Sequence, residues 1–309
     1  MNNYVNNHWR NILIIGAGEL GMAVIKGFYA QRESHPEIRL TVLLRPQSAS
    51  QNAQQRAEQL AQWDIGILTA DFNTVSIGEL AQLFTPYDAI INCSGFVGGM
   101  GTQIKITEAV LLAKVARYFP WQFGVDYDRI GENSGQPVWD EQLAVRSLLR
   151  AQQQTQWVIV STGMFTSFLF EADFGVVNLA SRTVHALGDA EFALTLTTPE
   201  DIGRLTASLF FHTPAISNEV IYIAGDTLTY TQLTALLAQH FATDFTCQVE
   251  RIAALKAANI NAPHDRYAAY RLAFAREDGV SWPMVNTYNY REGIELTSVK
   301  QWLVQERMK

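Results

Sequence analysis

The chain has 309 residues, a length that fits about two domains of ordinary size. Hydrophobic residues make up 48% of it and charged residues 17%, a balance that supports a packed core and excludes global disorder. The net charge of −7 argues against a nucleic-acid-binding protein, which needs a basic face to neutralise phosphates. Two cysteines, Cys93 and Cys247, exclude a disulfide framework. Because the start is polar and no apolar stretch could span a bilayer, we expect a cytoplasmic protein that does not enter the membrane.

Short apolar runs alternate with helix-forming segments along most of the chain. The predicted strands cover 11–15, 40–44, 65–68, 89–93, 116–123, 157–160 and 220–223. The predicted helices cover 19–32, 51–63, 107–117, 140–153 and 229–241. Asp140 is a candidate N-cap of the fourth helix, and Thr229 with Gln232 fits a capping box before the fifth. Apolar strands separated by helices predict an α/β fold with a doubly wound parallel sheet.

A glycine-rich loop joins the first predicted strand to the first predicted helix. It reads Gly16-x-Gly18-Glu19-Leu20-Gly21. The first glycine suits a tight turn, the second lets a pyrophosphate approach the backbone, and the third allows close helix–strand packing. The helix N-terminus offers free N–H groups to the phosphates. We therefore expect all five named residues to contact a dinucleotide, although a purely structural glycine turn is the alternative.

The end of the second strand distinguishes NAD from NADP. An Asp or Glu at this position would bind the ribose 2′-hydroxyl of NAD. The sequence instead has Arg45, which can bind a 2′-phosphate bidentately, and Ser48, whose hydroxyl could add a donor. The pattern favours NADP(H); in the alternative, Arg45 is a solvated loop cation.

Two further strand ends point to the same crevice. Asp71 and Phe72 follow the third strand, where they could border the adenine, or be a loop acid beside a buried aromatic residue. Ser94, Gly95 and Phe96 follow the fourth strand, at the carboxyl edge where parallel sheets bind ligands. The sequence thus predicts a Rossmann-type domain over 1–160. A smaller substrate-binding region over 161–309 should follow, with a strand near 220–224 that returns to the main sheet.

The sequence resembles the atypical short-chain dehydrogenases of the NmrA-like and isoflavone-reductase-like group, which includes phenylcoumaran benzylic ether reductases. The resemblance covers most of the chain and rests on 16–21, Arg45, 117–126, 161–165 and 199–204. Its most specific part is Arg-Tyr-Phe-Pro-Trp-Gln-Phe-Gly at 117–124, which is similar to the family's Arg-Phe-Phe-Pro-Ser-Glu-Phe-Gly. The resemblance implies an NADPH-dependent reductase, and we include Phe123 among the cofactor contacts.

The sequence departs from the family at its chemistry. Trp121 and Gln122 replace the Ser and Glu of the fifth-strand motif, and Gln142 stands where the family's catalytic lysine belongs. None of the eleven tyrosines has a lysine four residues on, so the usual short-chain dehydrogenase pair is missing too. Gln142 could orient a water or stabilise an oxyanion, but its amide cannot give up a proton at neutral pH. Arg146 lies one turn further on the same helical face.

Tyr127, at the carboxyl end of the fifth strand, is the candidate replacement acid, unless it is a packed loop residue. Met164, Phe165 and Phe168 follow the sixth strand and suit a flat apolar or aromatic substrate. Four aromatic residues of the tail could line the same pocket or belong to the core: Tyr267, Tyr270, Phe274 and Trp282. The six histidines are scattered, so we expect no metal site.

Two functions remain open from the sequence. The first is an NADPH-dependent oxidoreductase acting on a small aromatic or conjugated carbonyl-type compound. The second is an NmrA-like redox-sensing regulator that binds the dinucleotide without turnover and acts on a partner protein, a reading that the missing lysine favours. A sugar-nucleotide enzyme on the same scaffold is a further alternative.

Overall fold

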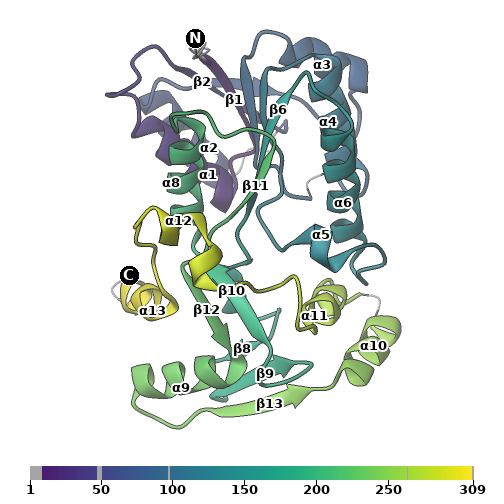
Figure 1. The fold of residues 1–309 in the computed structure, drawn as a ribbon, viewed down its shortest axis with the longest axis vertical. Coiled ribbons are helices and arrows are strands. Elements are labelled where there is room, and N and C mark those ends of the chain that lie inside the picture. Colours follow the sequence, from purple (N-terminus) through teal and green to yellow (C-terminus); the bar gives the residue numbers. More distant parts are fainter. Residues whose placement is uncertain (1–8, 47–50, 97, 263, 308–309) are drawn as a thin grey trace. The chain divides into compact units, whose positions relative to one another are not determined.

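The computed structural model describes residues 9–46, 51–96, 98–262 and 264–307 (Figure 1). The chain forms two compact units, and each unit is assembled from three separate segments. Unit 1 comprises Met1–Gln122, Ala144–Ile159 and Ile202–Val220. Unit 2 comprises Phe123–Leu143, Val160–Asp201 and Ile221–Lys309.

Unit 1 is built on a seven-stranded sheet in the order β11-β6-β5-β4-β1-β2-β3. The pairs β1–β2, β2–β3, β1–β4, β4–β5 and β5–β6 are all parallel. The order reverses between β1 and β4, which in open α/β sheets is where ligands bind. The strands are β1 (Asn11–Ile15), β2 (Arg39–Leu44), β3 (Gly66–Thr69), β4 (Ala89–Asn92), β5 (Arg117–Phe119), β6 (Gln156–Ser161) and β11 (Glu219–Tyr222).

Helices cover both faces of this sheet, as the continuous apolar strands predict (Figure 1). One face carries α1 (Glu19–Tyr29) and α8 (Pro199–Phe210); the other carries α3 (Ile77–Phe84), α4 (Thr102–Leu112) and α6 (Pro137–Arg150). Helix α2 (Gln51–Gln62) connects β2 to β3. Side chains of β1, α3, α4 and α6, among them Leu13, Phe84, Ile106 and Leu149, form one buried cluster on the second face. The Rossmann-type fold is therefore confirmed.

Two glycines bring α1 and α8 into close contact. A Cβ atom on Gly27 would lie 2.4 Å from the carbonyl oxygen of Gly203, and one on Gly203 would lie 2.2 Å from that of Ala23. No side chain fits at either position without moving a backbone. Gly203 lies in the segment 199–204, which carries part of the family resemblance. The close contact between α1 and α8 explains why a glycine is needed at this position.

The helix predictions differ from the structure in several boundaries and omit several helices, and three of these differences have a clear local cause. α4 begins five residues earlier than predicted because Gly101, with a φ of +83°, turns the chain directly into it. α6 begins at Pro137, so the prediction of Asp140 as N-cap is wrong; its carboxylate instead accepts a hydrogen bond from the backbone N–H of Ser134. α3 was not predicted, although Ser76 and Glu79 form a capping box at its start.

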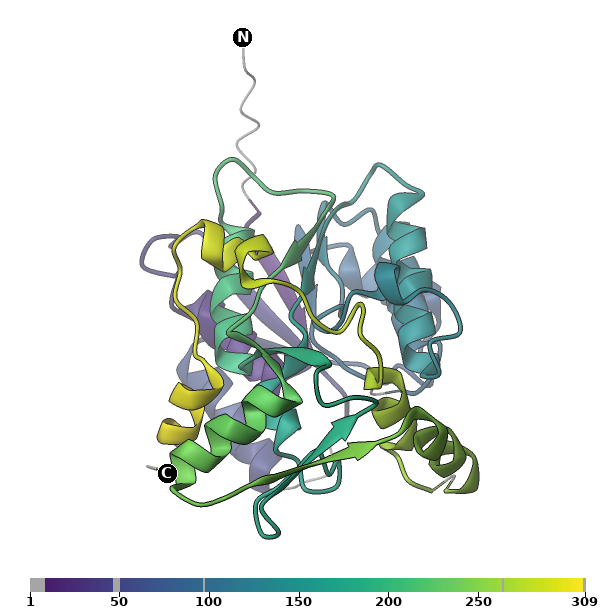
Figure 2. The ribbon, with the colours of Figure 1, turned by 60° about the horizontal axis from the view of Figure 1, so that its bottom comes forward.

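Unit 2 contains two three-stranded sheets. The first has the order β12-β10-β7 and the second β13-β9-β8. Helix α9 (Tyr230–Phe241) runs alongside the second sheet in both views (Figures 1 and 2) and starts with the predicted capping box of Thr229 and Gln232. The strands are β7 (Met164–Phe165), β8 (Val177–Asn178), β9 (Thr183–Leu187), β10 (Ala193–Thr197), β12 (Asp226–Thr229) and β13 (Thr246–Glu250).

The remaining helices of unit 2 are short. They are α5 (Tyr127–Ile130), α7 (Thr166–Leu169), α10 (Ile252–Asn261), α11 (Ala268–Phe274), η1 (Met284–Asn286), α12 (Tyr288–Arg291) and α13 (Val299–Arg307). Their apolar side chains pack with both sheets around one core that includes Leu169, Phe174, Leu237, Phe274 and Leu303. None of the described helices is long and apolar enough to cross a membrane.

Candidate functional site

The glycine loop has the geometry that its spacing predicts. Gly16 has a φ of +90°, and a Cβ atom on it would lie 2.9 Å from the carbonyl oxygen of Cys93 at the end of β4. A Cβ atom on Gly21 would lie 2.3 Å from the carbonyl oxygen of Gly16. The first glycine therefore makes the turn against β4, and the third lets α1 pack on the loop.

The middle glycine lies in open space. A Cβ atom on Gly18 would meet no heavy atom within 4 Å, and the residue is exposed. Gly18 is the N-cap of α1, and no side chain caps this helix. Among the described residues, the first N–H groups of α1 thus have no intrahelical or capping partner, and a helix N-terminus in this state attracts a phosphate. Glu19 is exposed and Leu20 is buried in the first turn.

Arg45 directly follows β2 and is exposed. Within the described part of the chain its guanidinium makes no hydrogen bond and no ion pair. It is therefore available to a ligand at the carboxyl edge of the sheet. Ser48, the second predicted 2′-phosphate contact, lies outside the described residues.

A buried polar network holds the loop between β4 and α4. The Ser94 hydroxyl donates to Oδ1 of Asn92 at 2.8 Å and accepts from Nε2 of Gln103 at 3.1 Å. Gln103 also donates to the carbonyl oxygen of Gly95, and Asn92 donates to the hydroxyl of Tyr118. Burial raises the pKa of Tyr118 to about 12, so this phenol stays neutral. Ser94 and Gly95 are thus positioned by the protein itself, with the Ser94 hydroxyl engaged in the network.

Asp71 and Phe72, the predicted adenine contacts, both take part in interactions within the protein. Phe72 is 4% exposed and belongs to the core of unit 1, and its carbonyl oxygen accepts from Nζ of Lys105. Oδ1 of Asp71 accepts a hydrogen bond from the backbone N–H of Asn73 at 3.0 Å and so caps the turn after β3. An adenine contact of these two residues stays a prediction.

Phe96 pairs with one of the residues that departs from the family motif. Its ring meets that of Trp121 edge to face, with centroids 4.4 Å apart. Both rings are partly exposed. The bulky Trp121, at the place of the family's serine, therefore supports the loop after β4.

The second departure creates an unusual buried pair. Gln122 and Arg146 are both fully buried, and Nε of Arg146 donates to Oε1 of Gln122 at 2.9 Å. The guanidinium thus donates to an amide oxygen at a position where the family motif has a carboxylate. Gln142, in the place of the family lysine, is fully buried as well.

Tyr127 is packed rather than exposed. It is 4% exposed, lies in the core of unit 2 and meets Trp139 edge to face. A Cβ atom on Gly124 would lie 2.5 Å from its hydroxyl, so the phenol oxygen lies directly over this glycine of the fifth-strand motif. Phe123, the neighbouring predicted cofactor contact, is buried.

The predicted substrate residues sit in an aromatic environment. Met164 is buried in β7, Phe165 is partly exposed, and Phe168 stacks on Phe174 with centroids 4.4 Å apart. Of the aromatic tail residues, Tyr267 and Tyr270 meet Phe168 edge to face, whereas Phe274 packs on Trp139 in the core. Burial, together with the neighbouring phenols of Tyr127 and Tyr267, raises the pKa of Tyr270.

Trp282 lies in a different environment from Tyr267, Tyr270 and Phe274. It lines a pocket of 780 Å³ within unit 2, whose charged and aromatic lining includes Asp126, Arg129, Tyr222, Glu277, Asp278 and Trp282. Sequence reasoning did not find this pocket, because its walls come from three segments that share no motif, and the lining residues Asp126 and Asn286 are 160 positions apart.

Other chemistries find no support in the described residues. They contain no group of three or more His, Cys, Asp or Glu side chains placed to hold a metal ion. Cys93 is buried at the end of β4, and burial raises the pKa of its thiol, so it stays protonated as a small apolar residue.

Comparison with known proteins places this geometry in a family. The profile of the NmrA-like family matches residues 9–273. An NmrA-like family domain-containing oxidoreductase of Gibberella moniliformis is 42% identical over 296 residues, 95% of this chain and 97% of the relative. The phenylcoumaran benzylic ether reductase Betv6 of Betula pendula is 23% identical over 74% of each chain.

Solved structures share the fold. The binary complex of leucoanthocyanidin reductase with NADPH from Vitis vinifera superposes with a TM-score of 0.78 at 16% identity, over 97% of this chain and 100% of that one. An NADPH-dependent quinone oxidoreductase from Escherichia coli gives a TM-score of 0.72 at 18% identity, over 96% and 99% of the two chains. The chain belongs to the NmrA-like family.

Proposed function

We propose that this protein is an NADPH-dependent oxidoreductase that reduces a small aromatic or conjugated carbonyl-type substrate. The observation that carries the proposal is the open backbone at Gly18, which leads into the uncapped N-terminus of α1. Arg45, exposed and without a partner among the described residues, supplies the cation for a 2′-phosphate. The similarity to an oxidoreductase over nearly the whole chain and to an NADPH complex in fold supports the same assignment.

The residues divide the work as follows. The N–H groups at the start of α1 bind the pyrophosphate, and Arg45 binds the 2′-phosphate. When bound, NADPH would supply a hydride to the electrophilic carbon of the substrate, and a proton would have to reach the substrate oxygen. Tyr127, whose hydroxyl lies over Gly124, is the proposed donor of that proton. The amide of Gln142 replaces the family lysine as a hydrogen-bond donor that orients a water or the oxyanion.

The proposed substrate class follows from the side chains after β6. Met164 and Phe165 form β7, and Phe168 lies among the rings of Phe174, Tyr267 and Tyr270. Apolar and aromatic walls favour a flat, weakly polar substrate over a charged one. The names of relatives and structural neighbours support this class, since they include a phenylcoumaran benzylic ether reductase, a leucoanthocyanidin reductase and a quinone oxidoreductase.

Calorimetric titration with NADPH, NADP⁺, NADH and NAD⁺ tests the proposal. We expect micromolar binding of the two phosphorylated cofactors, with little preference for either redox state. A screen of aromatic aldehydes, ketones and quinones should then reveal a substrate-dependent loss of NADPH absorbance. The absence of any dinucleotide binding would overturn the proposed function.

A second function is favoured by one specific observation, the buried Gln142 where the family has a lysine. In this alternative, the protein is a dinucleotide-binding redox sensor without turnover and acts on a partner protein. A sensor must bind one redox state more tightly than the other, since a ligand shifts a conformational equilibrium only through differential affinity. A strong preference for NADP⁺ or NADPH in the same titration, together with no turnover, would support it.

A further inference from the structure

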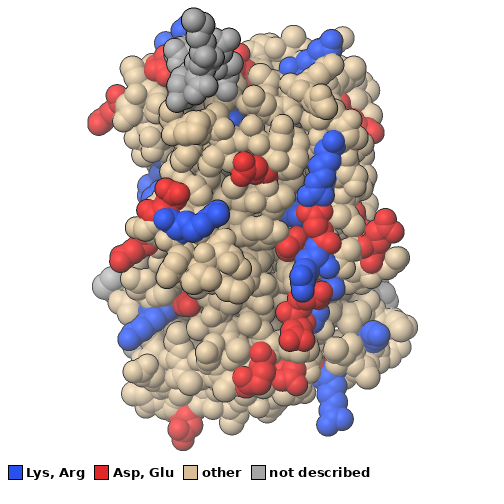
Figure 3. All heavy atoms as spheres, viewed as in Figure 1, with Lys and Arg blue, Asp and Glu red and all other residues tan. Residues whose placement is uncertain are grey.

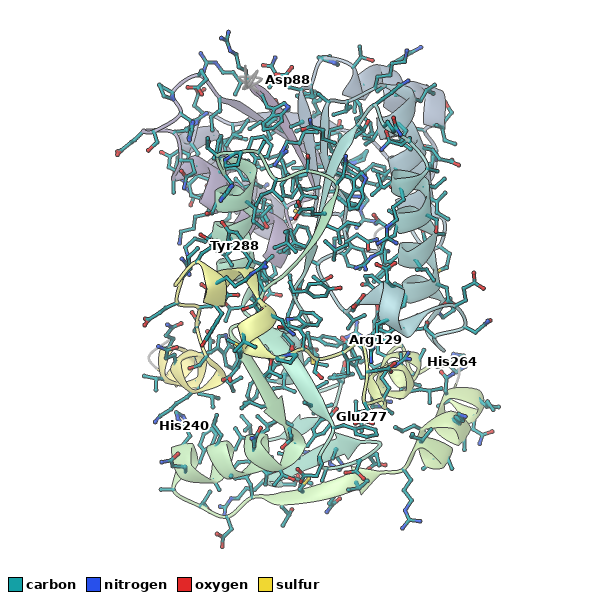
Figure 4. The ribbon with its side chains drawn as sticks, in the orientation of Figure 1. Asp88, Arg129, His240, His264, Glu277 and Tyr288 are labelled. Carbon is teal, nitrogen blue, oxygen red and sulfur yellow. The ribbon has the colours of Figure 1, made fainter. Side chains whose placement is uncertain are left out.

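The pocket around Trp282 is built entirely from unit 2, and no cofactor contact proposed for the glycine loop takes part in it. Its volume of 780 Å³ lies within the usual range for small-molecule sites. The walls come from α5 and its N-cap Asp126, from β11, and from the segment that runs from the end of α11 through η1. Figure 4 labels Arg129 from the first of these segments and Glu277 from the third.

A glycine fixes the third segment against the first. Gly279 has a φ of +74°, and a Cβ atom on it would lie 2.5 Å from Cγ1 of Ile130. Its carbonyl oxygen accepts a hydrogen bond from the backbone N–H of Asp126 at 2.8 Å. This close approach places Asp126 beside Glu277 and Asp278 around one cavity.

The aromatic wall is held rigidly. Trp282 donates from its backbone N–H to Oγ1 of Thr195 at 3.1 Å and from Nε1 to the carbonyl oxygen of Ile223 at 3.2 Å. Its ring meets that of Tyr222 edge to face, with centroids 5.1 Å apart. A wall fixed by hydrogen bonds does not have to become ordered when a ligand binds, which favours affinity.

The polar lining is predominantly acidic. It contains three carboxylates, Asp126, Glu277 and Asp278, and one guanidinium, Arg129. The hydroxyl of Tyr222 donates to Oδ2 of Asp126 at 2.8 Å, which fixes this carboxylate next to the aromatic wall. Asp278 is already paired, because its Oδ1 accepts a hydrogen bond from Nε of Arg276 at 3.0 Å and its Oδ2 lies 4.0 Å from Nε of Arg129. Asp126 and Glu277 are therefore the carboxylates that would face a ligand. Acidic and basic side chains alternate on this face of the molecule (Figure 3).

We propose that this pocket binds a small organic ammonium ion. Its positive charge would face the carboxylates, and its hydrocarbon body would lie against Trp282 and Tyr222. A cation over an aromatic face gains electrostatic attraction to the ring, and methylated ammonium groups also bury apolar surface there. A bare metal ion does not fit, because the described residues contain no set of side chains arranged to coordinate one. The inference stands independently of the proposed dinucleotide chemistry.

Choline and its uncharged isostere 3,3-dimethylbutan-1-ol are the probes that separate charge from shape. Both should be titrated calorimetrically into the full-length protein at matched ionic strength. We expect saturable binding of choline and binding of the alcohol that is weaker by about 10-fold or more, because only the cation interacts with the rings and carboxylates. Equal affinity for the two, or no saturable binding of choline, would overturn the proposal.

Two exposed charges of the lining give effects of opposite sign. Glu277→Gln should weaken choline binding by about 2- to 5-fold, and Arg129→Gln should strengthen it by a similar factor, in line with the usual strength of exposed charge pairs. The matched control is Asp244→Asn, which removes an exposed carboxylate of unit 2 away from the pocket and should change nothing. A loss of stability would move both variants in the same direction, whereas the proposal requires opposite directions. Identical affinities of all three variants would overturn it.

Discussion

Nε of the buried Arg146 donates a hydrogen bond to Oε1 of the equally buried Gln122 at 2.9 Å. The family motif has a glutamate at the position of Gln122. In this protein the guanidinium therefore donates to a neutral amide in place of a carboxylate. Removing one partner of a buried charged hydrogen bond costs more than the bond itself is worth, because the remaining charge stays desolvated.

Gln122→Met tests this pair. It keeps the side-chain volume but removes the acceptor, and we expect the free energy of unfolding to fall by about 1–3 kcal/mol. Gln122→Glu restores an acceptor and adds a charge partner, so it should be at least as stable as the natural protein. Urea unfolding followed by circular dichroism measures both. A methionine variant of unchanged stability would show that the bond contributes nothing.

Arg45→Asp should weaken NADPH binding by about 10-fold or more while leaving NADH binding nearly unchanged, because the contact is made only to the 2′-phosphate. Arg10→Asp is the matched control: it makes the same change of charge at an exposed residue before β1, at the opposite edge of the sheet. Titration calorimetry gives the dissociation constants of NADPH and NADH for the natural protein and for both variants. An equal loss for both cofactors would remove Arg45 from the proposed role.

Two of the three loop glycines, Gly18 and Gly21, should respond differently to replacement by alanine. Gly21→Ala places a methyl group 2.3 Å from a backbone oxygen, so we expect a loss of about 1–3 kcal/mol in the free energy of unfolding. Gly18→Ala meets no atom of the protein and should retain stability, but its methyl group occupies the space proposed for the pyrophosphate and should weaken NADPH binding. Thermal unfolding with and without NADPH distinguishes the two variants. Undiminished NADPH binding by the Gly18 variant would contradict the phosphate assignment.

Tyr127→Phe tests the proposed proton donor. If the phenol delivers the proton, its removal should lower kcat by about 100-fold or more, the usual range for general acid catalysis, with a smaller effect on KM. Tyr290→Phe, at a tyrosine that is 58% exposed, is the control. Unchanged turnover in the Tyr127 variant would assign the proton to another group.

Asp226 predicts a pH dependence of stability. Burial raises the pKa of its carboxyl group above the ordinary value of 3.8, although Oδ2 accepts a hydrogen bond from the backbone N–H of Val299. The folded state then holds this proton to a higher pH than the unfolded state, so the carboxyl group lowers stability as pH rises from 3.8 through the folded-state pKa. Asp226→Asn keeps an acceptor and removes the charge.

We therefore expect the asparagine variant to be more stable than the natural protein at pH 7, with the difference shrinking towards pH 4. Urea unfolding at several pH values measures it, with Asp244→Asn as the exposed comparison. A stability difference that grows on acidification would show that the sign of the pKa shift is wrong.

The sheet could be predicted from the sequence because its signals are local. β1 has a run of apolar residues too short for a helix, and the glycines at 16, 18 and 21 fix both the end of the strand and the start of α1. The boundaries of α4 could not be predicted as well, since they depend on the left-handed backbone at Gly101 and Lys114 rather than on periodicity. Asp140 looked like a helix cap, but the structure starts that helix one turn earlier at Pro137.

The functional residues also differ in whether a local sequence signal predicts them. The turn and packing roles of Gly16 and Gly21 follow from one short motif, whereas the pocket of Asp126, Tyr222 and Trp282 depends on contacts between distant segments. The hydrogen bond between Tyr222 and Asp126 joins residues 96 positions apart. Nothing in the sequence around either residue encodes the other, so only the folded chain brings them together.

The packing of α1 on α8 has a consequence for how the protein can be divided. Gly203 touches the backbone of Ala23 across more than half the length of the chain, and the segment 202–220 belongs to the same compact unit as the glycine loop. A fragment that ends near residue 160 would lack α8, so the face of α1 that packs on α8 would be exposed to solvent and prone to aggregation. The two halves expressed separately should aggregate alone, yet recover a dinucleotide-binding unit when they are produced together, which makes the chain a candidate for split-protein complementation.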